Sequence, residues 1–139
     1  ALKIPITEGA YDAHYRIDLD HIFMPTFASF RDASAQMGTL LHEAAHATGA
    51  KHRLDRNFAE RFKRDSLAIE EICAELTASF VLADLGIAHH PRADHAAYVA
   101  SWLRALKDDP RAIFTAASKA QAAADWMHAQ QPQPEEMAA

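Results

Sequence analysis

Apolar residues follow two different spacings along this chain, and the change of spacing separates a short N-terminal part from a longer helical part. Residues 11–18 alternate loosely between apolar and polar side chains, and His21–Met24 is a short apolar run that ends at a proline. Because such patterns are typical of strands, we expect two strands of a small antiparallel sheet. Residues 1–10 contain a proline and a glycine and are expected to form a loop or an edge segment.

The rest of the chain carries apolar residues three and four positions apart, which predicts helices. The first helix should begin at a cap formed by Ser29 or Asp32 and continue to about Thr48. Gly49 is expected to stop it in the left-handed conformation. Three further helices are expected, over residues 65–85, 93–106 and 110–128. These elements predict an α+β fold that is mainly helical.

Two polar segments are expected to lie outside the helices. Residues 51–56 are basic and predict an exposed loop, in which Arg53 and Arg56 are solvated rather than bound to an anionic substrate. The C-terminal segment has prolines and glutamines without apolar periodicity, so it predicts a tail or linker. We therefore expect one domain over residues 1–128 and a flexible tail over residues 129–139.

Composition narrows the class of protein. Half of the 139 residues are hydrophobic and 24% are charged, as in a globular domain, and the net charge of −5 argues against duplex DNA as the main partner. The single cysteine, Cys73, excludes an internal disulfide and favours a reducing compartment. No apolar run is long enough to cross a membrane and no secretory signal is evident, so we expect a cytoplasmic protein.

The candidate chemistry lies in the first helix, at His42, Glu43 and His46. Histidines four positions apart project from one helix face, and two neutral imidazoles at that spacing can hold one side of a tetrahedral Zn²⁺ ion. Glu43 lies at the edge of the same face, where it could take a proton from water on the metal. The apolar flanks argue against two ordinary surface histidines, because imidazoles in an apolar setting need polar partners.

The residues alone leave the third metal ligand open. His52 fits a longer motif in which a glycine turns the chain toward the metal, but that motif also needs a methionine below the metal, and neither Met127 nor Met137 is suitably placed. Glu71 and Glu75 are four apart on the next helix, so Glu71 could bind the metal while Glu75 accepts a hydrogen bond from a histidine. Alternatively, both are solvated carboxylates.

Several segments resemble the zincin-like metallopeptidase domain of ArdC-type antirestriction proteins and related polyvalent proteins of plasmids and phages. The resemblance covers about residues 11–128. It is carried by residues 41–49, 53–56, 70–76, 80, 85–87, 95–98, 101–103, 111–114 and 116–118. The later segments are more distinctive than the zinc motif itself.

The resemblance implies a zincin-like fold, with the sheet packed on the helix of His42 and His46, one Zn²⁺ ion and peptide hydrolysis. It favours a helix glutamate as the third ligand, since the position of His52 is usually not histidine in this family. We choose Glu71 over Glu75, because other glutamate zincins also follow the ligand with alanine and an acidic or amide residue.

The family also suggests a biological setting. Such domains usually follow an N-terminal domain that binds single-stranded DNA, in proteins that enter a recipient bacterial cell with mobile DNA and blunt restriction. We therefore expect a peptide or protein substrate, a restriction-system protein as a candidate partner, single-stranded DNA only through a separate domain, and no membrane. Tyr98 or His95 is a candidate donor to the oxyanion of the reaction, although an aromatic on a helix stripe is usually core and such a histidine is usually solvated.

Two rival functions stay open. In the first, the metal only stabilises a non-catalytic binding module that contacts a restriction enzyme or DNA. A solvent-open fourth position on the metal would distinguish an enzyme from this structural site. The second rival is a secreted metzincin-like protease, and the lack of a secretory signal and of disulfides counts against it.

Overall fold

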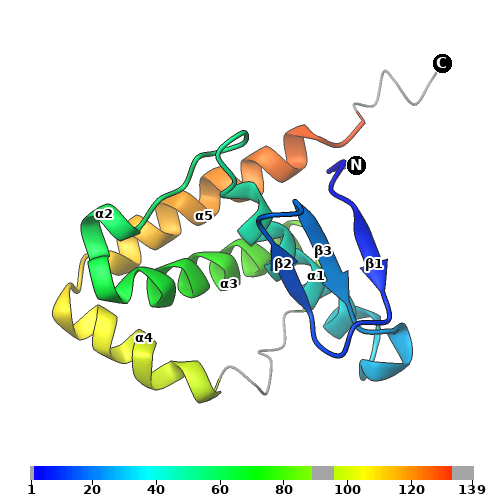
Figure 1. Cartoon of the computed structure of the whole chain (residues 1–139), viewed down its shortest axis with the longest axis horizontal. Coiled ribbons are helices and arrows are strands. Elements are labelled where there is room, and N and C mark those ends of the chain that lie inside the picture. Colours follow the sequence, from blue (N-terminus) through cyan, green and yellow to red (C-terminus); the bar gives the residue numbers. More distant parts are fainter. Residues whose placement is uncertain (1, 89–95, 133–139) are drawn as a thin grey trace.

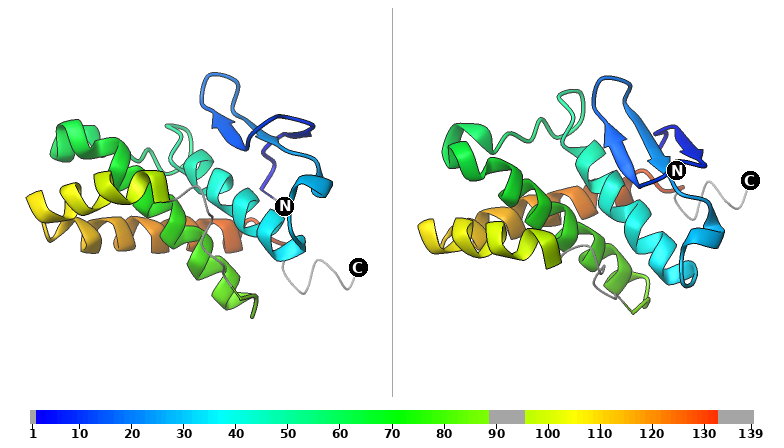
Figure 2. Two further views of the ribbon diagram at one scale, coloured as in Figure 1. Left: turned by 90° about the horizontal axis from the view of Figure 1, so that it is seen from below. Right: turned by 60° about the horizontal axis from the view of Figure 1, so that its bottom comes forward.

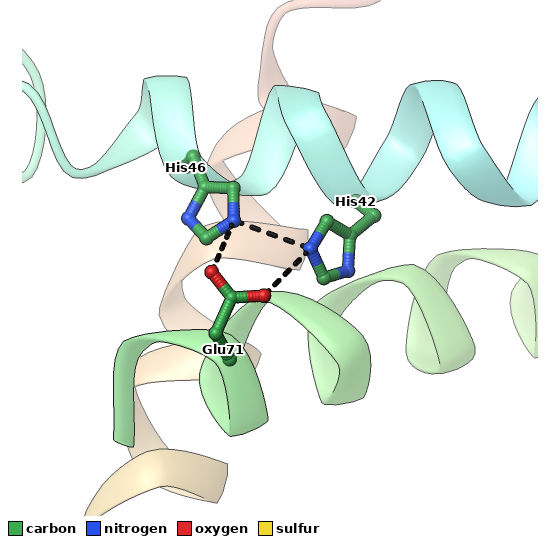
Figure 3. A group of neighbouring side chains, drawn as sticks. All are labelled: His42, His46 and Glu71. Atoms are coloured by element: carbon green, nitrogen blue, oxygen red, sulfur yellow. Dashed lines mark hydrogen bonds and ion pairs between the residues drawn. The ribbon is translucent and has the colours of Figure 1, made fainter. Parts of the chain in front are cut away.

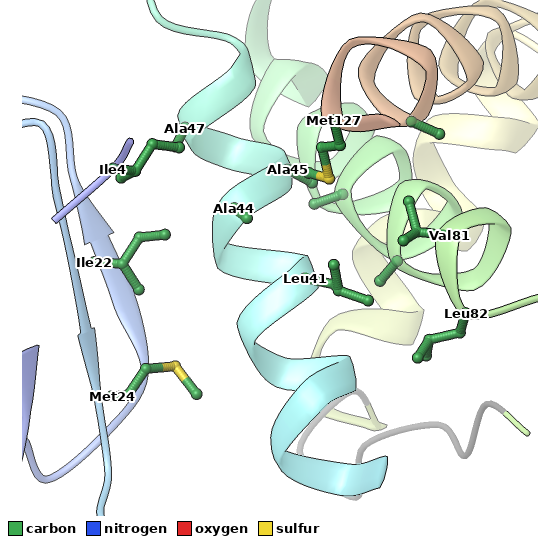
Figure 4. Packing of buried hydrophobic residues seen from close by; sticks show 13 residues of the cluster. Ile4, Ile22, Met24, Leu41, Ala44, Ala45, Ala47, Val81, Leu82 and Met127 are labelled. Carbon is green, nitrogen blue, oxygen red and sulfur yellow. The ribbon is translucent and has the colours of Figure 1, made fainter. Parts of the chain in front are cut away.

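A long helix, α1 (Ala33–Thr48), lies in the middle of the molecule, between a small sheet and two other long helices (Figures 1, 2 and 4). The computed structural model describes residues 2–88 and 96–132. Within them, the two long helices are α3 (Ser66–Asp84) and α5 (Ala112–Ala129). This arrangement confirms the predicted mainly helical α+β fold, with a small sheet packed on the first helix.

The sheet is mixed, with the strand order β1-β3-β2. The two predicted strands, β2 (His14–Arg16) and β3 (His21–Met24), pair antiparallel as expected. The N-terminal segment, expected as a loop or an edge segment, adds the edge strand β1 (Ile6–Glu8). It pairs parallel with the other edge of β3, so the expectation of a purely antiparallel sheet was wrong. The chain turns after β1 at Gly9, whose φ of +104° is a conformation that favours glycine. It then passes to the far side of β3 before β2 begins.

Small side chains let α1 approach its neighbours on both sides. Ala44, Ala45 and Ala47 are almost completely buried, so the helix backbone lies close to both layers. The sheet and the segment before β1 contribute larger apolar side chains to one side, and α3 and α5 contribute them to the other (Figure 4). These larger residues are Ile4, Ile22, Met24, Val81, Leu82 and Met127.

The two ends of α1 differ in how well the sequence predicts them. Asp32 caps the helix, as expected, because its Oδ1 accepts a hydrogen bond of 2.8 Å from the backbone N–H of Ala35. Gly49 does not adopt the predicted left-handed conformation, since its φ is −75° and its N–H donates back to the carbonyl of His46. A side chain at Gly49 would instead meet Arg56, because an added Cβ would lie 2.9 Å from its Nη2 atom.

The later helices agree with the predicted ones to within a few residues. The helix α4 spans Ala96–Asp108, and the predicted start of this helix at residues 93–95 lies outside the described residues. The short helix α2 (Ala59–Phe62) was not predicted. Gly86 follows α3 with a φ of +68°, so this glycine is the one that ends a helix in the left-handed region.

The predicted exposed loop at residues 51–56 instead buries both of its arginines. The Arg53 side chain is 8% exposed and binds both carboxylate oxygens of Asp20, each at 2.7 Å. The Arg56 side chain is 1% exposed and pairs with Glu70 on α3. The expectation of solvated arginines was therefore wrong, because the carboxylates that bury them lie far away in the sequence.

The last helix of the described residues is α5. Helix α5 ends at Ala129, and residues 133–139 lie outside the described residues. The division into a domain over residues 1–128 and a tail over residues 129–139 stays a prediction. Within residues 2–88 and 96–132, none of the helices combines the length and the apolar character needed to cross a membrane.

Candidate metal centre

Three side chains from α1 and α3 converge on one point (Figure 3). His42 and His46 project from neighbouring turns of α1, with their Nε2 atoms 3.2 Å apart. Glu71 reaches up from α3 between them, with Oε2 3.2 Å from Nε2 of His42 and Oε1 3.3 Å from Nε2 of His46. One nitrogen or oxygen atom from each of the three residues lies within 4.8 Å of the others, so these residues form a candidate metal site.

Carboxylates on α3 also hold the outer nitrogens of both rings. Nδ1 of His42 lies 3.1 Å from Glu75 Oε2, the contact that the sequence predicted for Glu75. Nδ1 of His46 lies 3.1 Å from Glu70 Oε1, a contact that the sequence reasoning missed. Both outer nitrogens are thereby engaged, which turns the two Nε2 atoms toward Glu71. The sequence shows an acidic residue beside Glu71, but not which histidine it meets.

The chain places the acidic and basic groups so that they shift each other's pKa. Burial alone lowers the pKa of His46, but Glu70 and Glu71 outweigh it and raise this pKa to about 10. Burial likewise opposes protonation of His42, while Glu71 and Glu75 raise its pKa. Burial would raise the pKa of Glu71, but hydrogen bonds from the two imidazoles lower it far below the usual range. These carboxylates therefore favour the protonated form of both imidazoles.

The donor set fits a divalent transition-metal ion. Two imidazole nitrogens and one carboxylate oxygen are the ligands of many catalytic zinc sites, which leave the fourth position to water. Manganese, cobalt and nickel ions can use the same ligands. Because both imidazoles present Nε2 and keep Nδ1 on a carboxylate, His42 and His46 are oriented as metal-binding histidines commonly are.

The site opens into a cleft of about 600 Å³ between β2, the segment after α1, and the start of α3. His42, His46 and Glu71 line this cleft. Glu43 lines it as well, and only 5% of Glu43 is exposed. The predicted metal ligands and the predicted proton acceptor therefore line the same cleft.

Another predicted site residue, His52, does not join this group. His52 is exposed, and its Nε2 lies 3.2 Å from Asp20 Oδ2 rather than beside the other histidines. Its place as the weaker alternative ligand is therefore not supported by the geometry. His95 and the side chain of Tyr98 lie outside the described residues, so both stay predictions as oxyanion donors.

Known proteins are similar to this chain in sequence. A family model described as "Zincin-like metallopeptidase" matches residues 1–119. The uncharacterized protein y4eC of Sinorhizobium fredii is 56% identical over 131 residues, which are 94% of this chain and 43% of that protein. A DNA primase TraC of Escherichia coli is 44% identical over 124 residues, which are 88% of this chain and 12% of the primase.

Solved structures of the antirestriction protein ArdC from plasmid R388 are similar as well. Its metal-free structure matches with a TM-score of 0.80 and 44% identity, over 91% of this chain and 46% of ArdC. Its Mn(II)-bound structure matches with the same TM-score and identity, over 92% of this chain and 48% of ArdC. The chain thus spans less than half the length of these relatives. It belongs to the family of zincin-like metallopeptidases, and it is a homologue of antirestriction ArdC.

Proposed function

We propose that this chain is a metal-dependent peptidase domain that binds one Zn²⁺ ion through His42, His46 and Glu71. The observation that carries the proposal is the convergence of these three ligands on the wall of an open cleft, with Glu43 on the same wall. When bound, the cation supplies Lewis acidity, which lowers the pKa of water and polarises a peptide carbonyl. Mn²⁺ is the principal alternative, because the related ArdC has a Mn(II)-bound structure.

Glu43 is the proposed general base. Its carboxylate takes a proton from the attacking water and then gives that proton to the leaving amine, so the same group acts twice. His42 and His46 keep their Nδ1 atoms on Glu75 and Glu70, which leaves their Nε2 atoms available as ligands. Glu71 supplies the third ligand from the opposite helix.

The cleft suggests how a peptide substrate lies. β2 is at the edge of the sheet, and in the described part of the chain it pairs with β3 alone. Residues 12–15 and Ile17, in and beside β2, line the cleft. An extended peptide can add to such an edge through backbone hydrogen bonds, with its scissile bond facing the ligands on α1. The edge strand beside the cleft supports a protein or peptide, rather than a nucleic acid, as the proposed substrate.

The relatives suggest where this peptidase acts. We infer that the domain belongs to a longer protein of mobile DNA that acts in the bacterial cytoplasm, with a restriction-system protein as its candidate partner. Single-stranded DNA would bind only through a separate domain. The similarity to an antirestriction protein supports this setting.

A metal-stabilised binding module is the second candidate. It is favoured by the ion pairs from His42 and His46 to Glu70, Glu71 and Glu75, because these pairs join α1 to α3 and would stabilise the fold without any reaction. The open cleft beside the ligands favours the enzyme instead, since a structural site has all its positions filled by protein.

Substitution of Glu43 by Gln tests the enzyme directly. The Glu43→Gln variant should still bind Zn²⁺, because Glu43 is not among the three convergent ligands. Its rate of peptide cleavage should fall by roughly 10²–10⁴-fold, the usual contribution of a general base. The measurement is cleavage of a random peptide library by the Zn²⁺-loaded chain, with a chelator-treated sample as control. Undiminished cleavage by Glu43→Gln would exclude the general-base role, and no cleavage by the wild-type chain would favour the binding module.

A further inference from the structure

The guanidinium of Arg56 binds the carboxylate that holds His46. Its Nε donates to Glu70 Oε2 at 2.8 Å and its Nη2 donates to Oε1, the oxygen that lies 3.1 Å from His46 Nδ1. The same guanidinium donates to the carbonyl of Ala45 at 2.8 Å and to Oγ1 of Thr48 at 2.9 Å. Arg56 is thus fixed to the last turns of α1 and to α3 at once, and its side chain is 1% exposed.

We propose that Arg56 is a positioning residue for the metal site, and that it acts through Glu70 on His46. This inference rests on the proposed function of His46 as a metal ligand. A two-point pair with a guanidinium fixes the plane of a carboxylate, because both donors lie in one rigid fork. With Glu70 held in this way, its Oε1 accepts from Nδ1–H of His46 and leaves the Nε2 lone pair directed at the metal.

Gly49 is needed to admit this guanidinium. An added Cβ at Gly49 would lie 2.9 Å from Nη2 and 3.0 Å from Cζ of Arg56. The φ of Gly49 is −75°, which any residue adopts, so the backbone itself does not require glycine. In this chain Gly49 therefore leaves room for the guanidinium of Arg56, and it does not turn the chain toward a third histidine.

Two nearby residues provide matched controls. Arg53 lies in the same segment, and like Arg56 it is buried, pairs with both oxygens of a carboxylate and donates to a carbonyl of α1. The carboxylate that it binds belongs to Asp20, which does not contact His42 or His46. His42 has its own outer carboxylate, Glu75, whereas the carboxylate that Arg56 binds among the described residues is Glu70, so His42 reports on the site without the arginine.

The first test measures the Zn²⁺ affinity of the purified chain by competition with a chromogenic chelator. Arg56→Gln should weaken Zn²⁺ binding by about 10–100-fold, the usual effect of removing an outer partner of a metal-binding histidine, and Arg53→Gln should bind as wild type does. Equal affinities for wild type and Arg56→Gln, or equal losses in both arginine variants, would overturn the inference. Failure of the wild-type chain to bind Zn²⁺ would instead overturn the proposed function.

A second test follows the histidine protons by NMR of the Zn²⁺-loaded, ¹⁵N-histidine-labelled chain. In the wild type, both Nδ1–H protons should be protected from exchange with water. In Arg56→Gln the Nδ1–H proton of His46 should exchange rapidly while that of His42 stays protected. Loss of protection at both histidines, or at neither, would overturn the inference. If Arg56→Gln does not fold, Gly49→Ala displaces the guanidinium at a position whose φ of −75° does not require glycine. This variant should weaken Zn²⁺ binding relative to wild type, whereas unchanged binding would overturn the inference.

Discussion

At the scale of single residues, each imidazole of the site has a carboxylate at both of its nitrogens. Glu71 faces the Nε2 atoms of His42 and His46, and Glu75 and Glu70 lie at the Nδ1 atoms. The raised pKa values of both histidines favour protonated rings beside these carboxylates. A cation that binds at Nε2 must displace one proton from each ring, so protons and metal compete for the site.

This competition predicts how the stability of the metal-free chain depends on pH. The pKa of His46 is raised to about 10 in the folded chain, above its ordinary value of 6.5, so the folded state holds this proton more tightly than the unfolded state. The contribution of this proton to the stability of the folded state is fully present below pH 6.5, and it is lost as the pH rises through about 10. Urea unfolding in a chelating buffer across this range should therefore show a falling free energy of unfolding. The fall should be much smaller in His46→Gln. An identical fall in that variant would show that His46 is not the source of this pH dependence.

At the scale of secondary-structure elements, the sequence predicts helices well and distant pairings poorly. The helix of His42 and His46 could be predicted because apolar periodicity and the Asp32 cap are local signals. The parallel pairing of β1 with β3 could not, because nothing in a three-residue strand specifies a distant neighbour. The burial of Arg56 was missed for the same reason, since Arg56 lies in the segment after α1 and its partner Glu70 lies on α3.

The end of α3 offers a test of the local signals. Gly86 has a φ of +68° and no atom within 4 Å of an added Cβ, so a substitution there changes only the backbone energy. Gly86→Ala should lower the free energy of unfolding by roughly 1–2 kcal/mol, the cost of a left-handed conformation with a Cβ. Gly86→Asn should lower the free energy of unfolding by less than Gly86→Ala does, because asparagine tolerates the left-handed conformation better than alanine. Equal stability of all three proteins in urea unfolding would show that the turn relaxes in solution.

At the scale of the whole molecule, the metal site joins the layers. α1 packs on the sheet through one side and on α3 and α5 through the other, and the candidate ligands lie across the boundary between α1 and α3. A cation held by both helices binds the folded chain alone, so it should stabilise the entire domain rather than one helix.

Thermal unfolding with and without metal measures this linkage. With free Zn²⁺ at 100 times its dissociation constant, the folded state should gain about 2.7 kcal/mol, and a chelator should reverse the gain. The midpoint temperature should rise as the Zn²⁺ concentration increases. His42→Ala removes one of the three ligands and should abolish the shift, whereas a shift of the same size in that variant would place the binding elsewhere.

The most direct test of the metal centre is a crystal structure of the chain grown with Zn²⁺, with anomalous data collected on both sides of the zinc absorption edge. We expect a single strong anomalous peak bonded to Nε2 of His42, Nε2 of His46 and a carboxylate oxygen of Glu71, with its remaining position open to the cleft. A peak that lies elsewhere, or a map without a peak between these three residues at saturating Zn²⁺, would contradict this expectation.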